Sequence, residues 1–180
     1  YTPYHTAYQI AQNADKDDHK LYDSAKARKK LAQWMSLHPT NVKEKAKFIV
    51  EHFIRNVAPL LDGEAKAMVV TDSRAAVVRY KYAISAYLDT HPEYNQNLVF
   101  ENLRFKVLGE PLVAFSGKLK GEKAVHPEDS YFVTDKDYVQ NPFAMIKTDY
   151  DYTEANMNNI SETIESAFNK RENRMLIVAN

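Results

Sequence analysis

Two short polar stretches in this chain have the residue types that bind phosphate, and each directly follows an apolar run. The first is TDSR at 71–74, after the apolar run 67–70, and the second is SG at 116–117, after the apolar run 112–115. Hydroxyl groups and the free N–H groups of a helix start donate hydrogen bonds to phosphate, an arginine adds positive charge, and a glycine lets the backbone come close. The sequence therefore predicts two phosphate-binding turns, which would lie side by side if the two apolar runs are neighbouring strands.

A purely structural interpretation of both stretches stays open. Asp72 or Ser73 would then only cap a helix, and Ser116 and Gly117 would form an ordinary turn after a strand. The carboxylate of Asp72 is also unfavourable for binding phosphate, because both groups carry negative charge.

The pattern around these stretches predicts an α/β domain with a mostly parallel sheet flanked by helices. The run 67–70 is apolar throughout, as expected for a parallel strand that is covered on both faces. Ligands bind beyond the carboxyl ends of such strands, where both polar stretches lie. The expected strands are 67–70, 112–115 and 175–179, and the expected helices are 43–61, 74–88 and a last one up to Phe168 that is capped near Asn158 or Asn159.

The first 45 residues are expected to be helical, because they lack strand patterning. One short helix would lie within 2–14, and a second would start near Asp23 or Ser24 and end at Pro39. We therefore expect a helical connector over 1–45 and a main domain over 46–180. An irregular insertion around 118–157 is too long for an ordinary connection, and its apolar residues would form a small hairpin or lid; they include Tyr131, Phe132, Val133, Phe143 and Met145.

The composition excludes several kinds of site. The chain has 180 residues, no cysteine, and equal numbers of basic and acidic side chains, 24 of each. Disulfides and cysteine-based zinc sites are therefore excluded, and a contact with nucleic acid must come from a local patch. No apolar run reaches the roughly 18 residues of a membrane span, and the first residues lack the pattern of a signal peptide.

Other catalytic patterns are weak. The six histidines are scattered, and the chain has neither a glycine-rich phosphate loop nor a G-x-S-x-G nucleophile motif. Tyr150 and Tyr152 lie in an irregular polar stretch, where stacking on nucleic-acid bases is a minor alternative to packing.

Both ends of the chain suggest a piece of a larger protein. The chain starts at Tyr1 without methionine and ends in MLIVAN at 175–180, which reads as a buried strand. We expect a fragment whose sheet has an unfinished edge at 175–179.

Several segments, in this order, resemble the R (restriction, or motor) subunit of type I restriction endonucleases. They are WMSLHPTNVKEKAKFIVEHF at 34–53, NVAPLLDGEAKAMVVTDSRAAVVRYKYAISAYL at 56–88, LVAFSG at 112–117, YTEANMN at 152–158 and MLIVAN at 175–180. The resemblance implies a DNA translocase of helicase superfamily 2, in which two RecA-like domains sandwich ATP and a separate nuclease domain cuts DNA. This chain would be the second RecA-like domain, truncated at motif V, because it has no phosphate loop and no acidic magnesium motif.

The resemblance also implies site residues, cofactors and partners. VVTDSR would correspond to helicase motif IV and AFSG to motif IVa, so the residues expected to contact DNA phosphates are Thr71, Ser73, Arg74, Ser116 and Gly117. The full-length subunit would be an ATP-dependent deoxyribonuclease that uses ATP and Mg²⁺, whereas this fragment alone would bind neither and be inactive. Its partners would be double-stranded DNA and the modification and specificity subunits, in the cytoplasm and without a membrane.

The chain also departs from this family. It stops before the Gln-Thr-Gly-Phe-Asp part of motif V and before motif VI, and the segments 95–111 and 118–150 are longer than the family pattern. Two other function classes therefore stay open: a stand-alone α/β module that binds a nucleotide or another phosphorylated small molecule, and a structural domain that docks a partner through its aromatic excursion.

Overall fold

The computed structural model describes residues 24–95, 97–100, 103–106, 109–126, 129 and 141–180. Two compact units are distinguished, Tyr1–Met35 and Ser36–Asn180. The first contains most of helix α2 (Ser24–Leu37), which confirms the helix expected before Pro39. The short helix expected within 2–14 lies outside the described residues, as do Tyr131, Phe132 and Val133.

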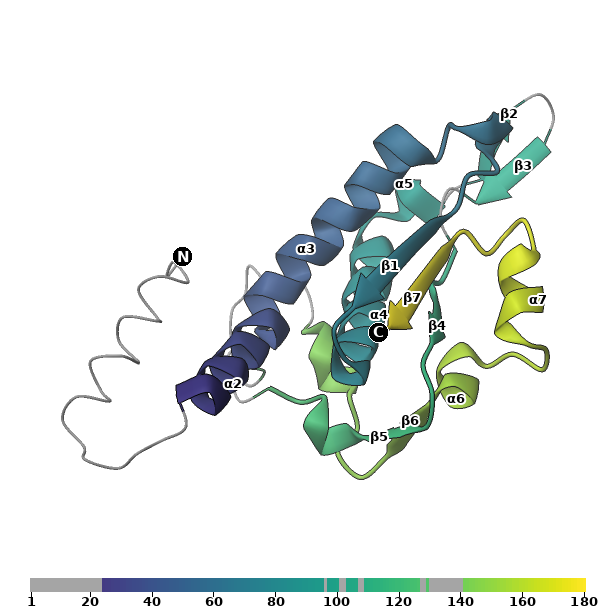
Figure 1. Cartoon of the computed structure of the whole chain (residues 1–180). Helices are drawn as coiled ribbons and strands as arrows, with labels where there is room; N and C mark the ends of the chain where they lie inside the picture. Colours follow the sequence, from purple (N-terminus) through teal and green to yellow (C-terminus); the bar gives the residue numbers. More distant parts are fainter. Residues whose placement is uncertain (1–23, 96, 101–102, 107–108, 127–128, 130–140) are drawn as a thin grey trace. The chain divides into compact units, whose positions relative to one another are not determined.

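The second unit is built on a three-stranded parallel sheet with the order β1–β7–β4 (Figure 1). Strand β1 is Ala67–Thr71, β4 is Leu112–Ala114 and β7 is Met175–Ala179. All three strands were predicted, and the α/β class is confirmed. The expected open edge at 175–179 is wrong, because Ile177 of β7 pairs with Val69 on one side and with Val113 on the other.

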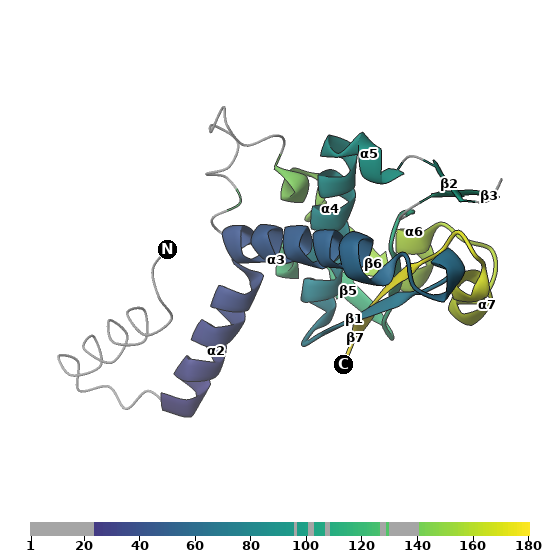
Figure 2. The same cartoon turned by 90° about the horizontal axis from the view of Figure 1, so that it is seen from above.

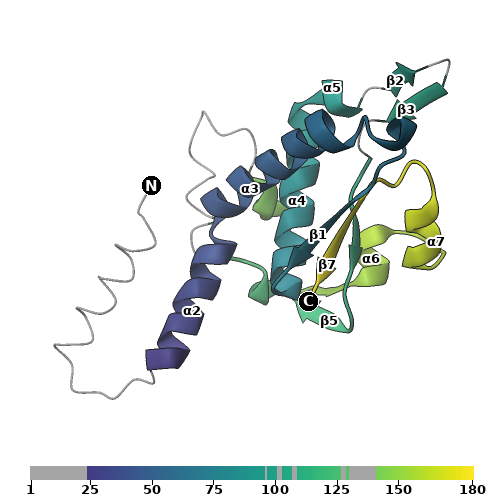
Figure 3. The same ribbon diagram turned by 45° about the horizontal axis from the view of Figure 1, so that its top comes forward.

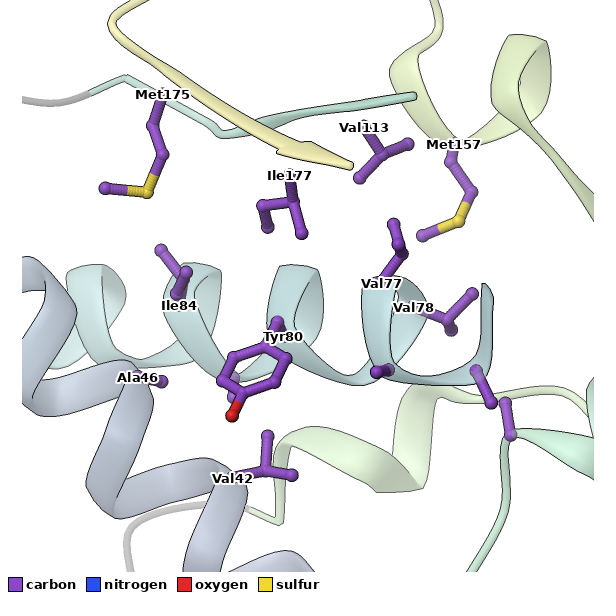
Figure 4. Packing of buried hydrophobic residues seen from close by; sticks show 14 of the residues in the cluster. Val42, Ala46, Val77, Val78, Tyr80, Ile84, Val113, Met157, Met175 and Ile177 are labelled. Carbon is purple, nitrogen blue, oxygen red and sulfur yellow. The ribbon is translucent and has the colours of Figure 1, made fainter. Parts of the chain in front are cut away.

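One face of the sheet packs on helix α4 (Arg74–Thr90), which confirms the helix predicted at 74–88. Figure 4 shows Val77 and Ile84 of α4 directed toward Ile177 of β7, and Val113 of β4 lies in the same buried cluster. Full burial of an aliphatic side chain of this size contributes about 1.5–3 kcal/mol, so the packing of this layer stabilises the fold. Helix α3 (Pro39–His52) packs against α4, as Figure 2 shows.

The opposite face is only partly covered. Leu112 and Leu176 alternate with the residues that face α4, and they pack on Ala167 of helix α7 (Ile164–Asn169). At β1 the same face has no such cover among the described residues: Met68 and Val70 are 58% and 63% exposed. The expectation that β1 is covered on both faces is therefore wrong, because α7 packs on Leu112 of β4 and Leu176 of β7 (Figure 3).

The helix expected near 158–168 is two short helices. Helix α6 (Glu154–Asn158) is capped by Thr153, and α7 is capped by Thr163. Asn159 was expected to start a helix, but it ends α6 in the left-handed conformation, with φ 50°. This conformation is common for asparagine after the last helical turn.

Asn158 was also expected to cap a helix, and instead it pairs with the outer edge of the sheet. Its side chain donates to the carbonyl oxygen of Val113 at 2.7 Å and accepts from the N–H of Val113 at 2.8 Å. The carboxylate of Glu154 accepts from the N–H of Phe115 at 3.2 Å. Side chains of α6 thus take the place of a further strand at β4 and satisfy backbone groups there.

The helix expected at 43–61 begins earlier and changes from an α-helix to a π-helical turn near its end. Pro39 is its first residue, since a proline at that position loses no helical hydrogen bond. After His52 the helix continues as a π-helical turn, Phe53–Val57, and a 3-10 turn, Leu61–Gly63, leads into β1.

Two antiparallel pairs lie outside the parallel sheet. Strands β2 (Asn97–Phe100) and β3 (Leu103–Lys106) form a hairpin that follows the short helix α5 (Pro92–Asn95) and was not predicted. Strand β5 (Lys118–Lys120) pairs with β6 (Asp151–Thr153) at the two ends of the segment that was expected to be an irregular insertion. Between these two strands lie the 3-10 turns Gly121–Lys123 and Pro142–Met145.

A buried ion pair attaches this segment to α4. Arg79 is fully buried, and its guanidinium donates to both carboxylate oxygens of Asp129, at 2.9 and 3.1 Å. It also donates to the carbonyl oxygen of Ala124 at 2.8 Å and lies 3.9 Å from the centre of the Phe143 ring. The carboxylate of Asp129 accepts a further bond from the N–H of His126 at 2.7 Å.

Replacing Arg79 tests this attachment. We expect Arg79→Met to lower the free energy of unfolding by about 3–5 kcal/mol, because it leaves the carboxylate of Asp129 buried without its cation. Urea unfolding curves measure the loss. The double variant Arg79→Met/Asp129→Asn should recover part of the stability, since it removes the unpaired charge. An unchanged midpoint for Arg79→Met would contradict the role of the ion pair.

A second constraint in the segment is the close approach of two backbones at Gly121. A Cβ atom there would lie 1.7 Å from the carbonyl oxygen of Lys147, so only glycine fits. The N–H of Gly121 donates to the carbonyl oxygen of Tyr150 at 2.8 Å. The two ends of the segment are therefore held together directly after β5.

We expect Gly121→Ala to destabilise the protein by about 3 kcal/mol, the upper range for overpacking, because the clash involves backbone atoms. Gly109→Ala is the matched control: its Cβ would meet the carbonyl oxygen of Glu172 at 3.1 Å, a contact that a small shift relieves. Thermal unfolding compares the two variants, and equal losses would exclude a special requirement at Gly121.

Candidate functional site

The turn between β1 and α4 is shaped by its own polar side chains. Ser73 caps α4: its backbone is extended, with φ −163°, and its Oγ accepts from the N–H of Ala76 at 3.2 Å. The same hydroxyl donates to Oδ1 of Asp72 at 3.2 Å. The capping role that the sequence left open for Ser73 is thus confirmed, and this role occupies its hydroxyl group.

Thr71 lies inside the fold at the end of β1. It is buried, and its hydroxyl donates toward the carbonyl oxygens of Ser73 and Val178, at 3.2 and 3.1 Å. These bonds join the end of β1 to the end of β7. The side chain of Thr71 therefore positions the turn, and its hydroxyl would have to leave these carbonyls to bind a ligand.

Arg74 joins the two predicted turns. β1 and β4 are not neighbours, because β7 lies between them. The first residue of α4 nevertheless spans this distance: Nη1 of Arg74 donates to the carbonyl oxygens of Ser116 and Lys118, at 3.3 and 3.1 Å. Arg74 is exposed, and among the described residues its other guanidinium nitrogens have no hydrogen-bond partner.

Gly117 makes room for this arginine. Its φ is +73°, a conformation that is unfavourable for residues with a Cβ atom. A Cβ atom at this position would also lie 3.2 Å from Nη1 of Arg74. The glycine was predicted to let a ligand approach the backbone, and in the structure Arg74 approaches it. Ser116 and Gly117 are both exposed, so the tip of the turn is open to solvent.

Two lysines beside this turn were missed by the sequence analysis. Lys118 and Lys120 on β5 each lie 2.9 Å from a carboxylate oxygen of Asp151 on β6. Hydrogen bonds from Lys118 and then Lys120 hold the pKa of the Asp151 carboxyl below its ordinary value, and the bond that Lys120 donates to Asp151 raises the pKa of Lys120. The alternation in KLK was a usable signal, because it places both lysines on one face of a strand with Leu119 buried on the other.

With Arg74, these lysines form what we call the cationic edge: Arg74, Lys118 and Lys120. The backbone of Lys118 accepts from Arg74 while its side chain pairs with Asp151, so the three cations are linked through one strand. On this exposed surface the carboxylate of Asp151 pairs with both lysines and the charges of Glu122 and Asp149 also act on Lys120, whereas Arg74 has no ion pair among the described residues. Such a surface can bind an anion with more than one phosphate group.

The two tyrosines considered for base stacking differ in their exposure. Tyr152 is buried, and its hydroxyl accepts from the N–H of Lys147 at 2.8 Å, so this ring is part of the core. Tyr150 is exposed, and the ammonium group of Lys147 lies 5.6 Å from its ring centre. Only Tyr150 could therefore meet a ligand.

No protein-family model, curated protein or solved structure matches this chain. A function is therefore proposed from the geometry of the cationic edge and of the cavity next to it.

That cavity has a volume of about 240 Å³ and lies at the end of β1, between α3 and α4. Tyr80 of α4 contributes to its lining; in Figure 4 its ring extends from α4 on the side away from Ile177, toward Val42 of α3. Burial, and to a lesser degree the charge of Asp72, raises the pKa of Tyr80 to about 12. The ring packs in the core cluster, and the side chain also lines the cavity.

Metal and membrane sites have no support in the described part of the chain. No three His, Cys, Asp or Glu side chains there are grouped so that they could hold a metal ion. None of the described helices is long and apolar enough to cross a membrane.

Replacing Gly117 tests the approach of Arg74 to the turn. We expect Gly117→Ala to destabilise the protein by about 1–2 kcal/mol from its positive φ, and by a further amount from the contact with Arg74. Gly63→Ala separates the two effects, because Gly63 has φ +82° with nothing within 4 Å of its Cβ position. Urea unfolding of both variants measures the difference, and equal losses would show that the contact with Arg74 is unimportant.

Proposed function

We propose that this chain is part of the R subunit of a type I restriction endonuclease and that its cationic edge contacts the DNA backbone. The segments that resemble this family contain both turns of the site. The observation that carries the proposal is the Arg74 bridge, which links the end of β1 to the turn after β4. The parallel sheet, with both turns beyond the carboxyl ends of its strands, is compatible with a RecA-like motor domain.

Within this proposal the residues of the site have different tasks. Thr71 and Ser73 use their hydroxyl groups inside the turn and position Arg74. Arg74, Lys118 and Lys120 supply the charge that contacts phosphates. Ser116 and Gly117 supply an exposed turn, whose backbone lies beside Arg74.

DNA binding by this chain alone should be weak and sensitive to salt. The net charge of the whole chain is zero, so attraction comes only from the local edge. Affinity for DNA that depends on neutralised phosphates falls steeply as salt rises, because bound counterions are released from the DNA.

The remaining parts of the activity belong to the full-length subunit. ATP and Mg²⁺ would bind mainly through another RecA-like domain, because this chain has no phosphate loop. The chain alone should therefore neither hydrolyse ATP nor cut DNA. The modification and specificity subunits would be its partners, and the complex would act in the cytoplasm.

Fluorescence anisotropy with a labelled DNA duplex tests the proposal at low salt. We expect Lys118→Ala and Lys120→Ala each to weaken binding and to reduce the salt slope by about one, as the loss of one phosphate contact does. These variants leave the backbone bonds to Arg74 in place. Arg74→Ala should weaken binding further, since it removes a cation and loosens the turn.

The matched control is Arg55→Ala on the π-helical turn after α3. Arg55 is an exposed arginine whose only described ion pair is with Glu51, at 3.7 Å, so the variant removes the same charge outside the cationic edge. Binding by Arg55→Ala should equal that of the unchanged protein. If all four variants retain the same DNA affinity, or if the unchanged protein does not bind the duplex, the cationic edge is not a DNA contact.

A further inference from the structure

The cavity at the end of β1 has the composition of a small-ligand site. Its walls include Ile49 of α3, Val69 of β1 and Ala76 of α4, which are apolar. Its polar lining residues include Lys45 of α3, Asp72 of the β1–α4 turn and Tyr80 of α4, besides Ser36 and Thr71. Binding sites for small molecules usually combine apolar walls with a few polar groups that orient the ligand.

Tyr80 is the group that indicates a ligand. Only 9% of its surface is exposed, its hydroxyl makes no hydrogen bond with the described residues, and the hydroxyl oxygen keeps contact with solvent. A tyrosine hydroxyl that is reached by solvent and has no protein partner can donate to or accept from a ligand. A group inside the cavity that accepts a hydrogen bond would satisfy it.

Asp72 gives the cavity a hydrogen-bond acceptor, whereas the hydroxyl of Tyr80 can act as a donor. Its Oδ1 accepts from the hydroxyl of Ser73, and its exposed carboxylate can accept further hydrogen bonds. A ligand should therefore carry an N–H group for Asp72 and an oxygen or ring nitrogen for Tyr80. The ammonium group of Lys45, which is exposed at the rim, can donate to a second acceptor.

The size of the cavity further limits which ligands can fit. A volume of about 240 Å³ is below the roughly 300–1,000 Å³ of sites for drug-sized molecules, so it suits one small ring system. We propose that this cavity binds a nucleobase with an exocyclic amine, of which cytosine is the smallest, with the amine on Asp72 and the ring carbonyl on Tyr80. This site uses none of the residues of the cationic edge and does not depend on the proposed DNA contact.

Titration of the ¹⁵N-labelled protein with cytosine and with uracil tests the proposal. The two bases have the same size, but uracil has a carbonyl group where cytosine has its amine. We expect saturable NMR shifts at the cavity residues at about 1 mM cytosine and about tenfold weaker binding of uracil, since a hydrogen bond to a charged group is lost.

Three variants identify the contacts. Asp72→Asn should weaken the binding of cytosine about tenfold and strengthen the binding of uracil, because an amide can donate to the carbonyl group of uracil. Tyr80→Phe should weaken the binding of both bases. It breaks no described hydrogen bond, so the fold is retained. Tyr94→Phe on α5 is the control, since Tyr94 lies outside the cavity lining, and it should bind both bases as the unchanged protein does.

Cytidine monophosphate and a short single strand of deoxycytidine distinguish a free ligand from a base within a nucleic acid. Tighter binding of the strand, with shifts at the same residues, assigns the site to an unpaired base, and tighter binding of the monophosphate assigns it to a free nucleotide. The proposal is overturned if cytosine produces no saturable shifts, or if Asp72→Asn and Tyr80→Phe bind both bases as the unchanged protein does. Loss of DNA binding in Arg74→Ala with cytosine binding retained would leave this site intact.

Discussion

The central position of β7 is the constraint on which the rest of the structure depends. This strand pairs in parallel with β1 and with β4, each of which lies more than 60 residues before it in the chain. Parallel pairing brings the carboxyl ends of the three strands to one edge. It also sets the alternation by which Ile177 faces α4 while Leu176 faces α7.

The segment between β5 and β6 depends on this frame and is attached to it at few points. The Arg79–Asp129 ion pair attaches it to α4, and the close approach at Gly121 joins its two ends. A buried charge pair gains little net energy relative to apolar packing, but it is unfavourable to break. The pair therefore restricts where the segment can lie more than it adds to stability.

The same side chains serve the structure and form the candidate site. Arg74 holds the turn after β4 through one guanidinium nitrogen and leaves the others available to an anion. Asp151 orders Lys118 and Lys120, and it also reduces the positive charge that they present. Such a site is preorganised, since ligand binding does not have to order flexible cations. The nearby cavity shares the β1–α4 turn but uses Asp72 and Tyr80.

Local patterns in the sequence determined which segments are strands and helices. The apolar runs at β1, β4 and β7 and the pattern of the segment 74–88 were sufficient, because side-chain periodicity reflects burial on one element at a time. Ser73 could be recognised as a cap for the same reason, since its hydroxyl bonds to a backbone group only three residues away. The division of the last helix into α6 and α7 was missed, because asparagine fits both the start and the end of a helix.

Tertiary structure alone decided the order of the strands and the composition of the site. The sequence could not show that β7 lies in the centre, that Met68 and Val70 remain exposed, or that Asn158 pairs with β4. It also could not show that Arg74 reaches the turn after β4, or that Tyr80 borders a cavity with its hydroxyl unpaired among the described residues. These features depend on contacts between residues that are distant in the chain, and local periodicity contains no information about such distances.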